Sequence, residues 1–160
     1  MNIKRTFTIT ILFLFAIKAY SCNCPKVEDL KVKQISEYEN SEAVFVGEIL
    51  KIDTENHTFQ IKVSESFKGS EIGKIYTGKF DPSCGPRVDH KGKWIIYGVF
   101  IDSNILDING CGLSRSFEKP EFGHYKITKP KKYDNMEFWD FLMINAKEEL
   151  DKEIQILRKK

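Results

Sequence analysis

The sequence predicts a mainly β fold, in which five short strands close into a small barrel between a short N-terminal helix and a long C-terminal helix. Two observations lead to this prediction. Five apolar or alternating runs are separated by turns rich in Gly, Pro, Asp and Asn, and the last part of the chain has helical periodicity. The chain has 160 residues, of which 41% are hydrophobic and twelve are Phe, enough for one domain with a packed core.

The first 21 residues are typical of a secretory signal peptide. A basic pair is followed by an apolar run over 6–17, which is shorter than the roughly 20 residues needed to span a bilayer. Small residues two positions apart then precede Cys22, so we expect cleavage to make Cys22 the first residue of a secreted or periplasmic chain. The alternatives are a buried N-terminal strand, an uncleaved anchor, and a lipoprotein signal that would leave Cys22 acylated at a cell surface.

The segment that follows supplies the first helix and the strands. Residues 27–40 have apolar positions at roughly helical spacing, which predicts a short helix or, alternatively, an irregular segment. The predicted strands, in chain order, are 43–52, 58–67, 74–80, 93–101 and 105–111. The first two form a hairpin, because only the turn-like stretch 53–56 separates them, and the fourth is the most apolar run of the mature chain.

The chain after the predicted barrel, which covers about 22–117, has two parts. Residues 118–133 contain two prolines and a lysine cluster, and we expect an ordered loop. Asp134 and Glu137 have the spacing of a capping box, which predicts a helix from about 134 to 158. One face of this helix carries apolar residues that we expect to pack on the barrel: Trp139, Leu142, Met143, Ala146, Leu150, Ile154 and Leu157. The alternative is a helix that binds a partner.

The mature chain would contain four cysteines, Cys22, Cys24, Cys84 and Cys111. In an exported chain an even number of cysteines indicates disulfides, and a bridge between the first two is the least favourable because their close spacing strains its geometry. Two pairings remain open, each of which ties the N-terminus to two distant segments. The rival interpretation is a zinc site with four thiolates, but the chain lacks the C-x-x-C pairs that such sites favour. A terminus is normally frayed, so two bridges there suggest that it is presented to a partner. The alternative is that the bridges only secure a loose first strand.

Charge and histidine content argue against several classes of function. The net charge is +2 for the whole chain, and removing the three basic residues of 1–21 leaves 22 basic against 23 acidic residues. A nucleic-acid-binding protein would be clearly basic, so we expect no nucleic-acid partner. His57, His90 and His124 are scattered in turn-like stretches where we expect them to be solvated, and no Ser/His/Asp or Cys/His constellation can be argued. We expect a monomer that is not an enzyme and carries no cofactor.

Cys22-Asn23-Cys24, placed directly after a signal peptide, resembles the C-x-C start of the tissue inhibitors of metalloproteinases. The similarity covers about residues 22–117 and continues in short motifs: Val46-Gly47, Ile61-Lys62-Val63, Phe67-Lys68-Gly69, Ile75-Tyr76-Thr77, Cys84-Gly85, Gly92-Lys93 and Cys111. These 160 residues contain four cysteines, so we expect neither the second, six-cysteine domain of the animal members nor the family's third bridge. Such a reduced version would suit a bacterial or otherwise divergent member.

This resemblance implies an OB-fold barrel of the netrin-like kind and the disulfides Cys22–Cys84 and Cys24–Cys111. It also implies that the chain inhibits zinc metalloendopeptidases as a protein partner. The α-amino nitrogen and the carbonyl oxygen of Cys22 would ligate the catalytic zinc of the target, at the position that such a zinc keeps open for water.

The resemblance also assigns protease contacts. Asn23 would point into the specificity pocket beside the zinc, where the family more often has Thr or Ser. The other expected contacts are Cys24, Pro25, Pro82 and Ser83. Because an amide side chain has four hydrogen-bonding sites to satisfy, burying Asn23 unpaired in an apolar pocket would cost roughly 1–3 kcal/mol. The alternative functions are a netrin-like binding module without inhibitory activity and a surface lipoprotein acylated on Cys22.

Overall fold

The structure is a computed structural model of the chain, and it describes residues 24, 29–86, 88–120, 133 and 136–160. The predicted signal peptide and the residues Cys22, Asn23, Pro25 and His124 lie outside this described part. Within it, no helix combines the length and the apolar character that crossing a membrane requires.

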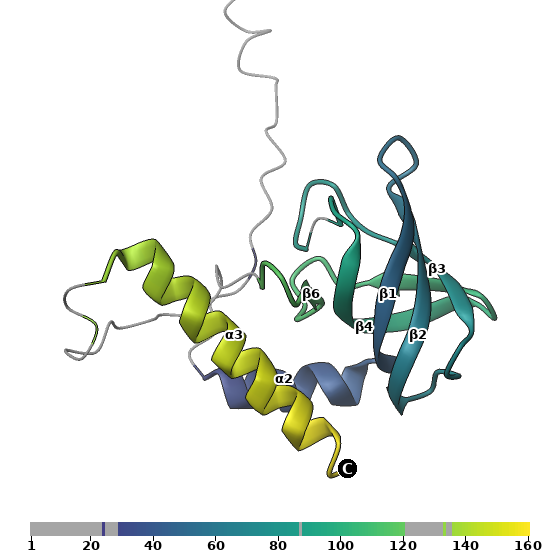
Figure 1. Ribbon diagram of the computed structural model, residues 1–160. Helices are drawn as coiled ribbons and strands as arrows, with labels where there is room; N and C mark the ends of the chain where they lie inside the picture. Colours follow the sequence, from purple (N-terminus) through teal and green to yellow (C-terminus); the bar gives the residue numbers. More distant parts are fainter. Residues whose placement is uncertain (1–23, 25–28, 87, 121–132, 134–135) are drawn as a thin grey trace, which may run out of the picture.

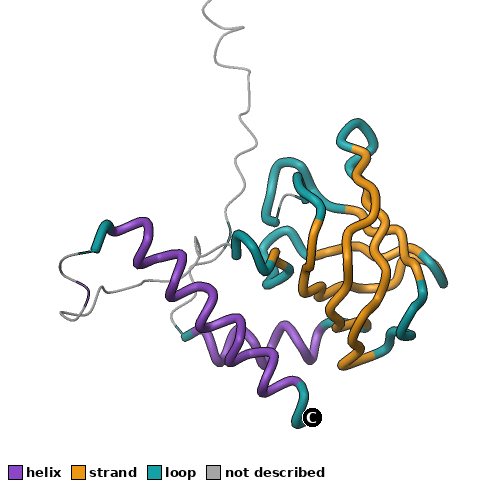
Figure 2. Tube along the Cα trace, viewed as in Figure 1, coloured by secondary structure: helices purple, strands orange, loops and turns teal. Residues whose placement is uncertain are grey.

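The described strands form one sheet that closes into a barrel, with the two helices of the described part on its outside (Figures 1 and 2). The strands are β1 (Ala43–Asp53), β2 (Thr58–Lys68), β3 (Ile75–Lys79), β4 (Gly92–Asp102), β5 (Ile105–Ile108) and β6 (Arg115–Ser116). β1 pairs with both β2 and β4, and β3 pairs in parallel with β5, so the order runs β1-β2-β3-β5-β4 and back to β1. The predicted five-stranded barrel of the OB-fold is therefore confirmed.

Two details of the strands differ from the prediction. β5 ends at Ile108, not at 111, because the chain turns there. The amide of Gly112 donates to the carbonyl of Asn109 at 2.9 Å, and the amide of Cys111 donates to Asn109 Oδ1 at 3.0 Å. The two-residue strand β6, which pairs with the start of β4, was not predicted, because so short a segment carries no periodic signal.

The barrel wall is apolar on both sides along β1 and β4. Their inward-facing side chains help to fill the barrel and include Phe45, Ile49, Trp94 and Ile96. Their outward-facing side chains form a second cluster that includes Val44, Val46, Ile95 and Tyr97. Because both faces of these strands are buried, they have continuous apolar runs in place of the alternating pattern of a half-exposed strand.

Two helices cover the outer face of this wall and cross each other in Figure 1. α2 (Leu30–Asn40) begins after Asp29, whose side chain accepts hydrogen bonds from the amides of Lys31 and Val32, as a good N-cap does. α3 (Phe138–Leu157) is the predicted C-terminal helix, and Leu150, Ile154 and Leu157 on one of its faces belong to the outer cluster of β1 and β4.

The start of α3 differs from the expected capping box. The helix begins at Phe138, and its N-cap is Glu137, whose side chain makes no capping hydrogen bond. The expected N-cap Asp134 lies outside the described residues. The amide of Met136, just before the helix, donates to the carbonyl of Tyr133 at 2.9 Å.

The position of Trp139 also differs from the expectation for this end of α3. It was expected to pack on the barrel, yet it is 71% exposed, whereas Leu142 and Ala146 on the same predicted face are buried. α3 begins away from the labelled strands in Figure 1, and Trp139 belongs to its first turn, so the described strands offer that turn no wall to pack on. Phe141 is the buried aromatic residue of this turn, and its ring lies 5.1 Å from that of Tyr133.

Candidate functional site

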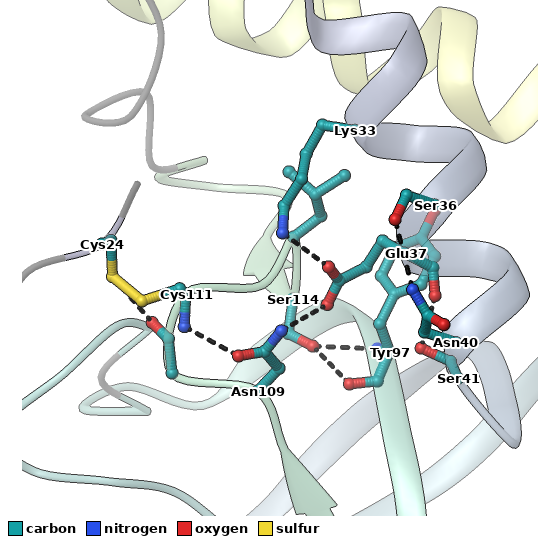
Figure 3. A network of polar contacts seen from close by, with 12 residues as sticks. Cys24, Lys33, Ser36, Glu37, Asn40, Ser41, Tyr97, Asn109, Cys111 and Ser114 are labelled. Carbon is teal, nitrogen blue, oxygen red and sulfur yellow. Dashed lines mark hydrogen bonds and ion pairs between the residues drawn. A yellow bond between two sulfur atoms is a disulfide. The ribbon is translucent and has the colours of Figure 1, made fainter. Parts of the chain in front are cut away.

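Three cysteines from distant parts of the sequence meet beside the barrel, and Figure 3 shows two of them, Cys24 and Cys111. Cys24 precedes α2, Cys84 lies between β3 and β4, and Cys111 lies in the turn after β5. Cys24 is bonded to Cys111, and the sulfurs of all three lie within 4.8 Å of one another. The structure thus contains one of the two disulfides that the family resemblance implies.

Cys84 is also disulfide-bonded. The partner that the resemblance implies for it, Cys22, lies outside the described residues. Zinc is bound by thiolates and not by disulfide sulfurs, so Cys24, Cys84 and Cys111 offer a metal no thiolate in this state. With these three cysteines in disulfides, the chain cannot form the rival zinc site with four thiolates.

Pro82 and Ser83 lie on the surface next to Cys84, in a loop that Asp81 organises. All three residues from Asp81 to Ser83 are exposed. The amide of Ser83 donates to Asp81 Oδ1 at 2.7 Å, and the amide of Cys84 donates to the Asp81 carbonyl at 3.4 Å. This is the local turn that an Asp side chain favours, and it places both predicted contact residues beside the Cys24–Cys111 bridge.

The two loops that carry Cys84 and Cys111 touch through their backbones. Gly85 has a φ of +83°, and a Cβ built on it would lie 1.5 Å from the carbonyl oxygen of Gly110. A Cβ on Gly110 would lie 2.9 Å from that of Cys84. Glycine alone permits this approach together with a positive φ, so Cys84-Gly85 and Gly110-Cys111 hold the two loops together.

A polar network ties the Cys111 turn to α2 (Figure 3). Asn109 donates from Nδ2 to Glu37 Oε1 at 3.3 Å, while its Oδ1 accepts the amide of Cys111. Glu37 is only 5% exposed, and Lys33, one turn earlier on α2, places Nζ 2.9 Å from Glu37 Oε2. The buried carboxylate therefore has one charged and one neutral donor, as burial requires.

Sequence reasoning missed this network. Glu37 is one of several charged residues on a helix, and its partner Asn109 lies 72 residues away, so no local pattern connects them. The spacing of Lys33 and Glu37 was the single available signal, because residues four apart on a helix face each other. That signal identifies an ion pair but does not indicate that it is buried.

A second buried polar cluster joins both helices to the barrel. Glu153 of α3 is 2% exposed, and its carboxylate accepts from Arg115 Nη2 and from the Tyr97 hydroxyl, each at 2.6 Å. Gln34 of α2 donates to the same carboxylate. Burial, together with the charge of Glu153, raises the pKa of Tyr97 well above its usual value, so its hydroxyl stays a donor.

Asp89, His90 and Ser116 form a hydrogen-bonded line that the sequence did not predict. His90 Nδ1 lies 2.6 Å from Asp89 Oδ1, and Nε2 lies 2.9 Å from Ser116 Oγ. Ser116 is 1% exposed, and its Oγ also accepts the amides of Glu118 and Lys119. This hydroxyl is enclosed and its lone pairs are occupied, so it is not placed to attack a substrate. His90, expected to be solvated, is half-buried and connects the loop before β4 to β6.

Comparison with known proteins adds no relative from which a role could be transferred. No family model matches the chain, and a search of curated proteins finds no match. The proposal below therefore rests on the motif resemblance described above and on the geometry of the described residues.

Proposed function

We propose that this chain is a secreted inhibitor of zinc metalloendopeptidases that acts through its mature N-terminus. The α-amino nitrogen and carbonyl oxygen of Cys22 would ligate the catalytic zinc of the target and displace its water. The observation that supports this most is the convergence of Cys24, Cys84 and Cys111 within 4.8 Å, sulfur to sulfur. An inhibitor of this kind needs a terminus that is held still, and Cys24 is only two positions from Cys22.

The described residues hold Cys24, two positions after Cys22, in a rigid setting. Cys24 is bonded to the Cys111 turn, and Asn109 of that turn is hydrogen-bonded to Glu37 of α2. Ordering a flexible side chain at an interface costs roughly 0.5–1.5 kcal/mol, and a segment that is already ordered avoids much of this cost. The covalent and polar contacts therefore favour tight binding by a short segment.

The chemistry of the N-terminal amine suits zinc at neutral pH. An α-amino group has a pKa of about 7.7–8.0, so a modest share is neutral at pH 7, and zinc binding would release the remaining protons. Inhibition should therefore weaken as the pH falls below about 7, because more of the amine must lose a proton to bind. Asn23 would enter the pocket beside the zinc, and the exposed Pro82 and Ser83 would form the second contact.

The disulfide at Cys84 also favours this proposal over a surface lipoprotein. Acylation of the Cys22 sulfur would remove the bridge that the family resemblance implies between these two residues. Cys84 would then be an unpaired thiol in an oxidising compartment, where free thiols are disfavoured. A netrin-like module without inhibitory activity would have the same disulfides, so only a binding experiment separates it from an inhibitor.

The test is a titration of the purified mature protein against a panel of zinc endopeptidases, after mass spectrometry of its N-terminus. We expect the mass of a chain that begins at Cys22 with a free amine and two disulfides, and stoichiometric inhibition of at least one zinc enzyme. Serine endopeptidases serve as the control and should be unaffected. An acylated Cys22, or a correctly processed chain that inhibits no zinc enzyme of the panel, would contradict the proposal.

A further inference from the structure

A groove lies between α2 and α3, and none of the described residues that line it is assigned to protease contact. Its volume is about 140 Å³, and its apolar walls include Ile35 and Tyr38 of α2 and Ile156 and Leu157 of α3. Ile35 is 53% exposed and Ile156 is 50% exposed. Apolar side chains on both walls of one concave surface mark a place where another apolar group gains by burial.

Positive charge flanks these apolar walls. Lys31 lies one helical turn before Ile35, and Lys160 lies four residues after Ile156, and both lysines line the groove. No described residue forms an ion pair with either ammonium group. The carboxylate of Glu153, which also lines the groove, does not neutralise them, because it is already paired with Arg115 and hydrogen-bonded to Tyr97.

The size of the groove fits one side chain. An apolar cavity of about 150 Å³ holds a benzene molecule, so this volume accommodates one Phe or Leu side chain. Lys160 Nζ lies 3.6 Å from the centroid of the Tyr38 ring, which holds the cation at the apolar wall. A carboxylate next to the inserted side chain would therefore meet this cation.

We propose that the groove docks an acidic segment of a second protein. The segment would insert one Phe or Leu side chain between α2 and α3 and place neighbouring carboxylates on Lys31 and Lys160. Charge complementarity selects this occupant, because a basic segment would be repelled and a neutral apolar one would leave both cations without a counter-charge. None of the described residues that line the groove is assigned to protease contact, so the chain would bind this partner and a protease independently.

The test uses the full mature chain and the peptide fluorescein-Gly-Asp-Glu-Phe-Glu-Asp-amide, followed by fluorescence anisotropy. We expect saturable binding that weakens as salt is raised. The variant Lys31→Glu with Lys160→Glu should bind at least about tenfold more weakly, because two attractive pairs become repulsive. The matched control, Lys79→Glu with Lys147→Glu, makes the same change in charge at exposed positions outside the groove and should stay within about twofold.

A further variant separates docking from general charge attraction. Ile35→Ser keeps both cations and removes one apolar wall, so we expect about fivefold weaker binding with an unchanged salt dependence. Three results would overturn the proposal. The first is that neither the Phe peptide nor its Leu analogue binds saturably up to about 1 mM. The second is that the control variant loses as much affinity for the peptide as the groove variant, and the third is that 3-phenylpropionate binds as tightly as the peptide, which would indicate a small-molecule pocket.

Discussion

The disulfide-bearing loops and the junction between α3 and the barrel are held by opposite means. At the loops, Cys24 is bonded to Cys111 and the backbones of Gly85 and Gly110 are in contact. At the junction, the buried carboxylate of Glu153 forms an ion pair with Arg115. Apolar side chains of α3 pack around this pair on the outer face of β1 and β4. The first arrangement does not depend on protonation or salt. The second depends on every buried charge keeping its partner.

This difference fits the two roles proposed for the regions. A segment that presents its end to another molecule has few neighbours to pack against, so a covalent bond is the effective way to fix it. A helix that lies along a barrel has apolar area to bury. A buried ion pair adds little net stability there. It does, however, disfavour any placement of α3 on the barrel in which Glu153 would be buried without Arg115.

The largest change in stability is expected from removing the bridge with Cys24→Ser and Cys111→Ser. The bridge joins residues 87 positions apart, and the chain-entropy model assigns a loop of this size roughly 4 kcal/mol. The free energy of unfolding, measured by urea denaturation, should fall by about that amount. A fall below about 1 kcal/mol would mean that the contacts of Gly85 and Asn109 hold the loops without the disulfide.

The next largest effect is expected at the junction, from Glu153→Gln. This change leaves the buried guanidinium of Arg115 without a counter-charge, which should cost about 3 kcal/mol of unfolding free energy. The matched control is Glu149→Gln on the same helix, which breaks the more exposed ion pair with Lys152 and should cost less than about 1 kcal/mol. Similar losses in the two variants would show that burial of the Glu153 pair is energetically unimportant.

A smaller effect tests the backbone contact at the loops. Gly85→Ala forces a side chain into a positive φ and against Gly110, so we expect a loss of about 2 kcal/mol in thermal or urea unfolding. Gly73→Ala is the control, because Gly73 has a φ of +84° but a Cβ there would meet nothing within 4 Å. Its loss should be about 1 kcal/mol, from the backbone conformation alone. Equal losses of unfolding free energy in the two variants would show that the close approach of Gly85 to Gly110 contributes nothing to stability.

The smallest effect concerns the end of α3, where Arg158 donates to both carboxylate oxygens of Glu65 at 2.7 and 2.9 Å. The hydrogen bond from Arg158 lowers the pKa of Glu65 below its usual value. A lowered pKa gives stability that is present above the unfolded-state pKa of about 4.3 and is lost as the pH falls through the folded-state value.

We therefore expect Glu65→Gln to lose about 0.5 kcal/mol at pH 7, because the pair is partly exposed. The difference from the parent chain should disappear in acid, where Glu65 is protonated in both states. The measurement is urea unfolding of the two proteins from about pH 7 down to about pH 3. If the difference in unfolding free energy between the two proteins persists at about pH 3, the effect comes from packing and not from the ion pair.

The barrel could be predicted from the sequence because its strands carry strong local signals. β1 and β4 have long apolar runs, and turn-forming residues separate all five strands. The start of α3 could not be predicted in the same way. Trp139 has the spacing of a packed residue, but whether a wall lies beneath it depends on where the helix sits on the barrel.

The candidate site could be predicted only where its residues are chemically distinctive. Cysteine spacing identified the segments that meet, because a disulfide is a long-range contact that composition reveals. Asn109 and Glu37 are ordinary residues in the sequence and become partners only when the Cys111 turn reaches α2. Glu153 likewise has the appearance of a solvated helix residue, since its partners Arg115 and Tyr97 lie 38 and 56 positions away.

The most direct test of the proposed mechanism compares the mature chain with a version that has one Ala placed before Cys22. The added residue turns the α-amino group of Cys22 into a peptide amide, which should no longer ligate the zinc of the target protease. The disulfides and the unfolding midpoint should stay unchanged. If the Cys22 amine is the ligand, the inhibition constant against a sensitive zinc endopeptidase should rise at least about 100-fold. Equal inhibition by the two forms would contradict ligation by the N-terminal amine.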